Sequence, residues 1–267
     1  MKTLSDLALE VLSTADGDQK AEISRQNALL WQKDPDMPIG KVNPPDRPAR
    51  PTKPELRAPT EMPRRRGGSD KARATLLHAV LHIELNAIDL AWDMVARFTA
   101  HDLPREFYDD WVQVGEEEGK HFQLLQTRLR ELGYSYGDFA AHDGLWEAAF
   151  ETRNELLARL AVVPMVLEAR GLDVTPGMIA RFAKMGDQAS VDILKVILND
   201  EIGHVASGNR WFHFICGREG KSPRETWQLL VRKNFRGLLK PPFNEDARTQ
   251  ADLTPDYYLP LTEAAEG

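Results

Sequence analysis

The sequence predicts an all-α protein built around a bundle of four long helices. Apolar residues recur at spacings of three and four over long stretches, whereas no segment shows the period of two that is typical of β-strands. The connections between these stretches are of medium length, as in helical bundles. With 267 residues, 42% of them hydrophobic, the chain is long enough to bury a sizeable core.

Two short helices, at about 3–13 and 18–32, are predicted in a first region, residues 1–35. Acids within the apolar part of this N-terminus favour an amphipathic helix over a signal peptide. A second region, residues 36–68, is rich in Pro and Arg and lacks apolar periodicity, which predicts an extended arm. Its basic residues outnumber its acids, so it could be a packed linker or a nucleic-acid contact. They are Arg47, Arg50, Lys53, Arg57 and Arg64–Arg66.

The third region, residues 69–217, contains the four long helices. We expect them at about 69–98, 105–132, 145–170 and 187–216. Pro164 predicts a kink in the third helix, and Gly171 with the following DVTPG predicts its end, before a short helix near 176–185. The fourth region, residues 218–267, has one more helix, in SPRETWQLLVRKNFRGL, and an irregular tail that should pack because it contains aromatic residues and leucines.

Each long helix has one glutamate on the face that its apolar residues define. In the first helix, for example, Glu84 is in register with Leu81 and Ile88. The second and fourth helices add a histidine three residues after the glutamate, on the same face and one turn further along. The complete set is Glu84, Glu118, His121, Glu168, Glu201 and His204.

A buried group of four carboxylates and two imidazoles calls for cations. One ionised carboxylate costs several kcal/mol to bury alone, and several would also repel one another. Oxygen and imidazole ligands suit iron or manganese, and the single cysteine, Cys216, excludes a cysteine-rich zinc site. A Glu from each of two helices with Glu-x-x-His from two others is the signature of ferritin-like di-iron and di-manganese proteins. We therefore expect a ferritin-like four-helix bundle with two iron ions, or with manganese or a mixed Mn/Fe pair.

The spacing of these residues repeats along the chain. Glu84 and Glu118 are 34 residues apart, and Glu168 and Glu201 are 33 apart. A helix of about 28 residues is roughly 40 Å long, so this offset lets an antiparallel hairpin bring both glutamates to one level. The two halves of the region thus repeat the order Glu, then Glu-x-x-His.

Residues beside the predicted ligands also have expected roles. Asp200 and Glu117 each directly precede a ligand glutamate, so their side chains point about 100° away from the metal. From there a carboxylate can accept a hydrogen bond from the non-coordinating nitrogen of a ligand histidine. Gly115 and Gly119, four residues apart on the second helix, predict a close approach of another helix or a bulge near the site.

Several segments resemble a known bacterial family: HAVLHIELNAIDLAWD at 78–93, EEEGKHF, VVPMVLEARGLDVTP at 162–176, DEIGHVASGNRWF and PPFNEDAR. They are similar, over nearly the whole chain, to the ferritin-like proteins catalogued as domain of unknown function 455. The resemblance implies a ferritin-like bundle with a di-metal site at the six residues named above, and it implies no reaction. More distantly, EEEGKHF with LEARGLD is similar to motifs of tRNA isopentenyladenosine hydroxylases, which many ferritin-like enzymes share.

Four functions are compatible with these observations. We favour a non-haem di-iron oxidoreductase, an oxidase or oxygenase that activates O₂ or peroxide and acts on an unidentified small-molecule substrate. The alternatives are an iron-handling ferroxidase, a tRNA-modifying hydroxylase that holds RNA on the basic arm, and a non-enzymatic bundle that is empty or holds structural zinc. A net charge of −7 argues against nucleic-acid binding.

The composition also bears on partners and location. Because the chain has no cysteine cluster, it cannot carry a rubredoxin-type iron centre, and electrons would have to come from a separate donor protein. No run of 18 apolar residues is present, so we expect a cytoplasmic protein without a membrane span. The sequence is compatible with a homodimer.

Overall fold

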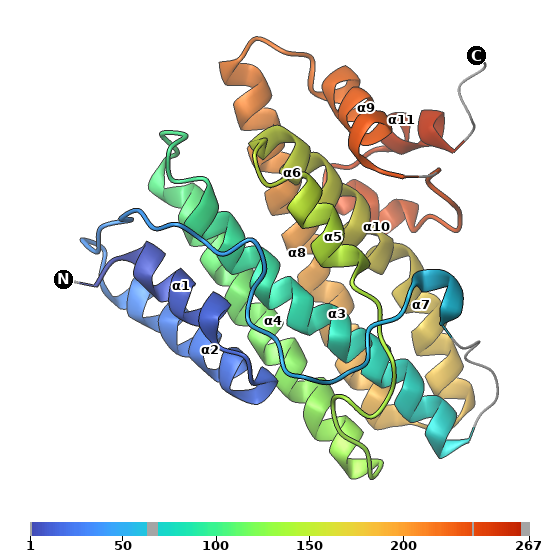
Figure 1. Ribbon diagram of the computed structural model, residues 1–267. Helices are drawn as coiled ribbons and strands as arrows, with labels where there is room; N and C mark the ends of the chain where they lie inside the picture. The colour runs from blue at the N-terminus through green and yellow to red at the C-terminus, as the bar shows by residue number, and fades with distance from the viewer. Residues whose placement is uncertain (1, 63–68, 237, 263–267) are drawn as a thin grey trace. The chain divides into compact units, whose positions relative to one another are not determined.

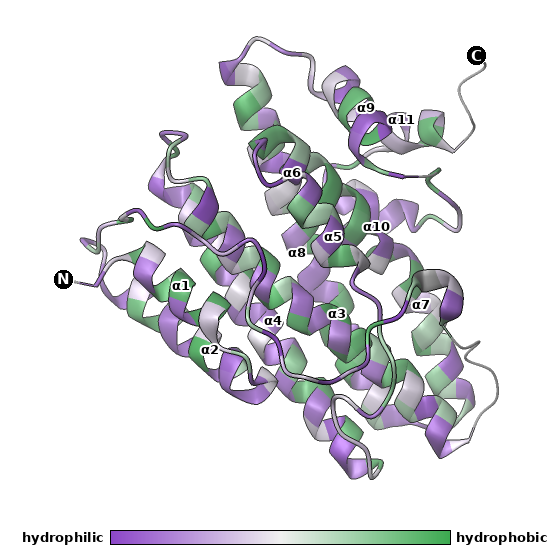
Figure 2. Ribbon diagram, in the orientation of Figure 1, coloured by the Kyte–Doolittle hydropathy of each residue, from purple (hydrophilic) through white to green (hydrophobic). Residues whose placement is uncertain are grey.

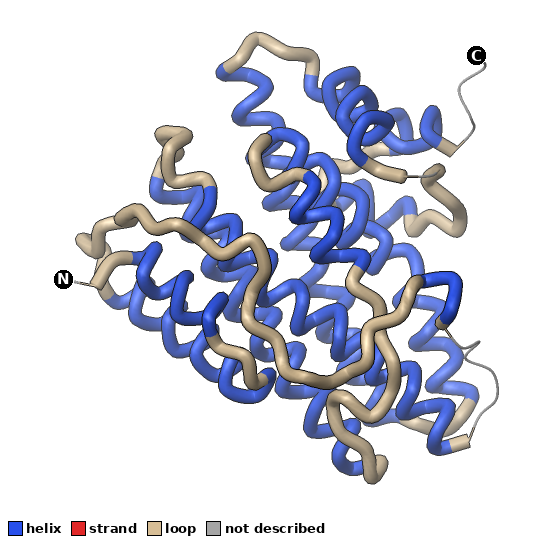
Figure 3. Tube along the Cα trace, in the orientation of Figure 1, coloured by secondary structure: helices blue, strands red, loops and turns tan. Residues whose placement is uncertain are grey.

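The computed structural model describes residues 2–62, 69–236 and 238–262, and in this part of the chain the regular elements are helices (Figures 1 and 3). A single β-bridge, between Leu56 and Ala141, is the only extended pairing among the described residues. The protein is therefore all-α, as predicted. The chain divides into two compact units, Met1–Trp146 and Glu147–Gly267.

Unit 1 contains two long helices and two shorter ones. They are α1 (Leu4–Ser13), α2 (Gly17–Lys33), α3 (Asp70–Arg97) and α4 (Arg105–Glu131), and α5 (Gly144–Glu151) begins at its end. Helix α3 packs on α4, α2 on α4 and α1 on α3. The side chains of Thr3, Asp16 and Ser69 cap the first turns of α1, α2 and α3, which explains where these helices start. These four helices agree with the predicted ones to within one or two residues.

Two glycines of α4 allow its neighbours to approach closely. A Cβ atom on Gly115 would lie 2.7 Å from Trp92 Nε1, and one on Gly119 would lie 2.9 Å from the carbonyl oxygen of Ala21. The Trp92 indole donates a 2.6 Å hydrogen bond to Ser24 Oγ, which in turn donates to the Gly115 carbonyl. The predicted close approach at these glycines is confirmed.

The arm lies along unit 1 as a packed linker. The Ser5 amide donates to the Ile39 carbonyl at 2.8 Å, and the Ala49 amide donates to the Leu12 carbonyl at 2.8 Å. Figure 1 shows this extended segment crossing α3. Among the described residues of the arm, the helical turn η1 (Pro59–Glu61) is too short to change the prediction of an extended arm.

Acids of unit 1 neutralise the basic side chains at the middle of the arm. Arg50 Nε lies 2.8 Å from Asp89 Oδ2, and the fully buried Lys20 bonds the other oxygen of Asp89. Arg47 pairs with Asp143. These contacts favour the packed linker over a nucleic-acid contact for Arg47 and Arg50, whereas Arg64–Arg66 lie outside the described residues.

Unit 2 differs from the prediction around the third long helix. Its elements are α6 (Leu156–Val162), a π-helical segment η2 (Val163–Glu168), α7 (Ala169–Lys184), α8 (Gln188–Arg218), α9 (Pro223–Asn234), α10 (Glu245–Gln250), α11 (Pro255–Tyr258) and η3 (Leu259–Leu261). The expected helix at 145–170 is interrupted at residues 152–155. It also does not end at Gly171, because α7 continues through Pro176 to Lys184.

Tertiary contacts explain both differences. The buried Arg159 side chain donates to the Ala149 carbonyl at 2.6 Å and to Thr152 Oγ1 at 3.1 Å, so it satisfies the last turn of α5 and stabilises the break. Pro176 lacks the amide that would bond the Leu172 carbonyl four residues earlier. The side chain of Asn244, from the tail, donates to that carbonyl at 3.1 Å instead.

The tail packs on unit 2, as predicted, but it is not irregular throughout. It forms α10, α11 and η3, and Leu253 and Tyr258 are completely buried. Its Arg248 makes a bidentate ion pair with Asp173 of α7, at 2.8 and 2.7 Å. This pair holds the tail against α7.

Hydrophobic and hydrophilic residues alternate along the helices in Figure 2, as expected for amphipathic helices. Among the described helices, only α3 is long and apolar enough to cross a membrane, and 83% of its most apolar window is buried inside the structure. Such burial is typical of the core helix of a soluble protein.

Candidate metal centre

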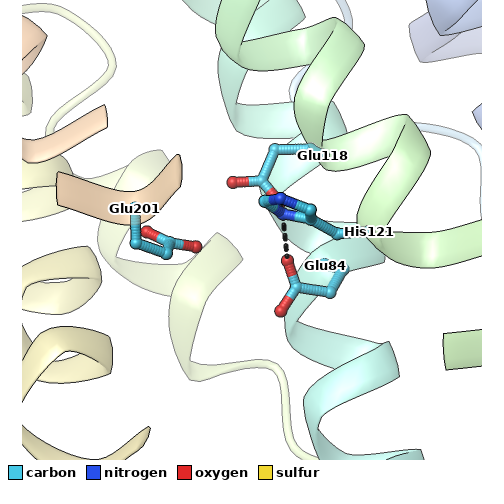
Figure 4. A group of neighbouring side chains, drawn as sticks. All are labelled: Glu84, Glu118, His121 and Glu201. Atoms are coloured by element: carbon cyan, nitrogen blue, oxygen red, sulfur yellow. Dashed lines mark hydrogen bonds and ion pairs between the residues drawn. The ribbon is translucent and has the colours of Figure 1, made fainter. Parts of the chain in front are cut away.

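Three of the six predicted ligands come together inside unit 1. Glu84 is on α3, and Glu118 and His121 are one turn apart on α4, so the packing of these two helices assembles the group (Figure 4). His121 Nδ1 lies 3.4 Å from Glu84 Oε2 and 3.4 Å from Glu118 Oε2. One potential ligand atom from each of the three lies within 4.8 Å of the others.

This group is fully removed from water. Glu118 and His121 are 0% exposed and Glu84 is 2% exposed. Burial raises the pKa of Glu84 well above its usual range, and the neighbouring Glu118 charge raises it further, while the hydrogen bond from His121 opposes the rise. Two carboxyls and an imidazole in such a place form a donor set that fits a divalent cation, which would offset the repulsion between the acids.

The other three predicted ligands belong to unit 2. On α8, Glu201 and His204 are one turn apart, and His204 Nδ1 lies 3.7 Å from Glu201 Oε2. Glu201, the fourth residue drawn in Figure 4, is 7% exposed and His204 is 1% exposed. Glu168 is the last residue of the π-helical segment η2, which packs on α8, and it is 9% exposed.

A close contact fixes the π-helical segment against α8. A Cβ atom on Gly208 would lie only 2.4 Å from Cβ and Cγ of Pro164, so only glycine fits there. π-helical turns are rare and are frequently found at functional sites. The predicted kink at Pro164 is thus a π turn, and sequence reasoning missed its form. The available signals were a proline four residues before Glu168 and a glycine four residues after His204.

The two acids next to the ligands make other contacts. Glu117 accepts a 2.8 Å hydrogen bond from Gln113, and Asp200 accepts one of 3.3 Å from Asn199. Both side chains are partly exposed. Their roles as hydrogen-bond acceptors for the ligand histidines stay predictions.

Comparison with known proteins agrees with the resemblance to domain of unknown function 455 that the sequence shows. Residues 13–259 match the family described as protein of unknown function (DUF455). A protein of Haemophilus influenzae, described as an uncharacterized protein, is 44% identical over 209 residues, which cover 76% of this chain and 73% of that protein. No solved structure matches the chain. The chain belongs to the DUF455 family.

Proposed function

We propose that this protein is a ferritin-like di-iron carboxylate protein, in which each unit supplies three ligands to one centre that holds two metal ions. The proposed ligands are Glu84, Glu118, His121, Glu168, Glu201 and His204. A manganese or mixed Mn/Fe pair is the alternative to iron, because the same oxygen and imidazole donors suit both metals.

One observation carries this proposal. The buried group of Glu84, Glu118 and His121 is a donor set that could hold a metal ion, and the same residue types recur in unit 2 at nearly the same spacing, 33 residues in place of 34. A lone buried acid could be tolerated by protonation. A repeated set is better explained by two cations that each need a histidine and share carboxylates.

The proposed reaction class is oxidation of an unidentified small-molecule substrate with O₂ or peroxide. Metal pairs of this kind supply redox chemistry and O₂ activation when bound. The chain itself would hold the pair through its carboxylates, orient it through His121 and His204, and exclude water with apolar neighbours such as Leu81 and Ile88, both 0% exposed. A separate protein would donate electrons, since Cys216 is the only cysteine.

The test is metal content per chain, measured by mass spectrometry after anaerobic loading with Fe(II) and removal of unbound metal. We expect about two iron ions in the wild type, and a loss of bound iron in Glu118→Gln and in His204→Ala, one variant in each unit. Glu116→Gln is the matched control, because Glu116 is two residues from Glu118 but pairs with Arg25 at 2.9 Å. Wild-type protein that retains no metal would exclude the proposed function.

The second measurement addresses the chemistry. Iron-loaded wild type should consume O₂ when it is mixed with aerated buffer, and Glu118→Gln given the same amount of Fe(II) should not exceed the rate of free Fe(II). An oxygen electrode reports both. Protein that binds two iron ions but consumes no O₂ or peroxide would leave a metal-binding bundle and contradict the proposed oxidase activity.

A further inference from the structure

Unit 2 has a cavity of about 320 Å³ between α7, the π-helical segment and the chain that follows α9. Its walls include Val166, Leu167, Phe235 and Phe243, so most of the lining is apolar. This volume is at the lower end of the range for small-molecule sites. At about 30 Å³ for each water, the cavity has room for about ten non-hydrogen atoms.

Four basic side chains also line this cavity, in a protein whose net charge is −7. Two of them are compensated by acids: Arg248 by Asp173 at 2.7 Å, and Arg236 by Glu151 at 2.8 Å. The other two are Arg170 and Lys240. Arg170 donates to the carbonyls of Lys240 and Pro242, at 2.6 and 3.0 Å, and lies 3.5 Å from Asp173. The same carboxylate pairs with Arg248, so one acid of the cavity wall serves two guanidinium groups.

Arg248 carries a buried donor that the protein does not use. The residue is 3% exposed, and its Nη1 atom is buried without a hydrogen-bond partner among the described residues. Its guanidinium lies over the rings of Tyr258 and Phe243, 4.5 and 5.1 Å from their centroids, so its position is fixed. A buried, unsatisfied guanidinium donor costs free energy unless an acceptor is supplied.

We propose that this cavity binds a small carboxylate with an apolar body. The carboxylate would accept hydrogen bonds from Arg248 Nη1 and Arg170, since guanidinium groups match carboxylates in geometry and charge. The apolar body would contact Leu167 and the phenylalanine rings. Lys240 adds a further positive charge at the same wall.

The cavity also adjoins the turn that carries a proposed metal ligand. Val166 and Leu167 line it and directly precede Glu168 in the π-helical segment. None of the six proposed ligands lines the cavity, so the cavity is a site beside this turn and not part of the proposed centre. Binding of a carboxylate there does not rest on the proposed function.

The test is calorimetric titration of the full chain, treated with a chelator, with octanoate, which has ten non-hydrogen atoms. Removing metal ensures that the carboxylate cannot bind as a metal ligand. We expect one site per chain, and binding weaker by about tenfold or more in Arg170→Met, which loses a charge-assisted hydrogen bond. The uncharged 1-octanol should bind wild type more weakly by a similar factor.

Arg224→Met is the matched control, because Arg224 pairs with Asp256 in an exposed bridge of the same unit and does not line the cavity. It should bind octanoate like wild type. No binding of octanoate, or equal binding by wild type and Arg170→Met, would overturn the proposal. Octanoate binding by a chain that retains no iron would keep the cavity site and reject only the proposed function.

Discussion

At the scale of single residues, the proposed centre costs stability in the absence of metal. Burial keeps the pKa of Glu84 well above its usual range, so the folded chain binds this proton more tightly than the unfolded chain does. Stability is therefore lost as pH rises from the ordinary glutamate pKa, 4.5, towards the higher pKa of the folded state. A metal ion would remove this cost by replacing the proton.

Glu84→Gln should therefore stabilise the metal-free protein at about pH 8, because the amide has no charge to bury. Urea denaturation in the presence of a chelator measures the effect. The free energies of unfolding of the two proteins should converge below about pH 4, where the glutamate is protonated in both states. A wild type that is the more stable at both pH values would contradict this account of Glu84.

Gly208 is a second residue that decides the local structure, because it has no side chain where Pro164 packs. Gly208→Ala should destabilise the protein by about 1–3 kcal/mol, because its methyl group would overlap the ring of Pro164. Gly203→Ala is the control on the same helix, where an added Cβ meets nothing within 4 Å. It should be neutral or stabilising by about 0.5–1 kcal/mol, since alanine favours the helix. Thermal denaturation of both variants separates packing from helix propensity.

At the scale of elements, the tail stabilises α7 at Pro176, a residue that would otherwise break this helix. Asn244→Ala should cost about 1–3 kcal/mol, because the Leu172 carbonyl next to Pro176 loses its donor and α10 loses its N-cap. In a Pro176→Ala background the helix regains an amide for that carbonyl, so the same change should cost less. Urea denaturation of the four proteins gives the coupling energy. Equal costs in both backgrounds would show that Asn244 does not act through Leu172.

The arm is attached through one buried charge cluster. Asp89→Asn should cost about 3–5 kcal/mol, because the fully buried Lys20 loses the carboxylate that compensates it. Asp143→Asn removes the partner of the half-exposed Arg47 and should cost less than about 1 kcal/mol. Limited proteolysis should also cut the arm faster in Asp89→Asn than in Asp143→Asn. Similar unfolding energies for the two variants would argue against this cluster as the anchor of the arm.

At the scale of the whole molecule, the proposed centre makes the stability of the chain depend on metal. Mn(II) at a hundredfold excess over its Kd should add about 2.7 kcal/mol for each ion bound, and a single ion corresponds to a rise in Tm of about 5–10 °C. Glu118→Gln and Glu201→Gln change different units, yet each should abolish the rise. Calorimetry measures all three proteins. A rise that survives in Glu201→Gln would mean that metal binds to unit 1 without unit 2.

Much of this molecule follows from the sequence because its helices are locally consistent. In α3 and α4 the apolar spacing and the lack of interior prolines agree, and Ser69 caps α3. Both the helices and the inward direction of Glu84, Glu118 and His121 could therefore be predicted. The same periodicity placed Glu201 and His204 on one face of α8. These features depend on the 3.6-residue turn alone, which is a property of the local backbone.

Tertiary structure decided the features that depend on distant partners. Pro176 does not end α7 because Asn244, 68 positions further along the sequence, supplies the missing hydrogen bond. The break before α6 depends on a buried arginine, and the π turn before Glu168 depends on the space that Gly208 leaves. Local propensity predicts none of these, since each comes from a donor or a contact that only folding brings into reach. The cavity of unit 2 is likewise a product of packing, because the residues that line it show no common spacing in the sequence.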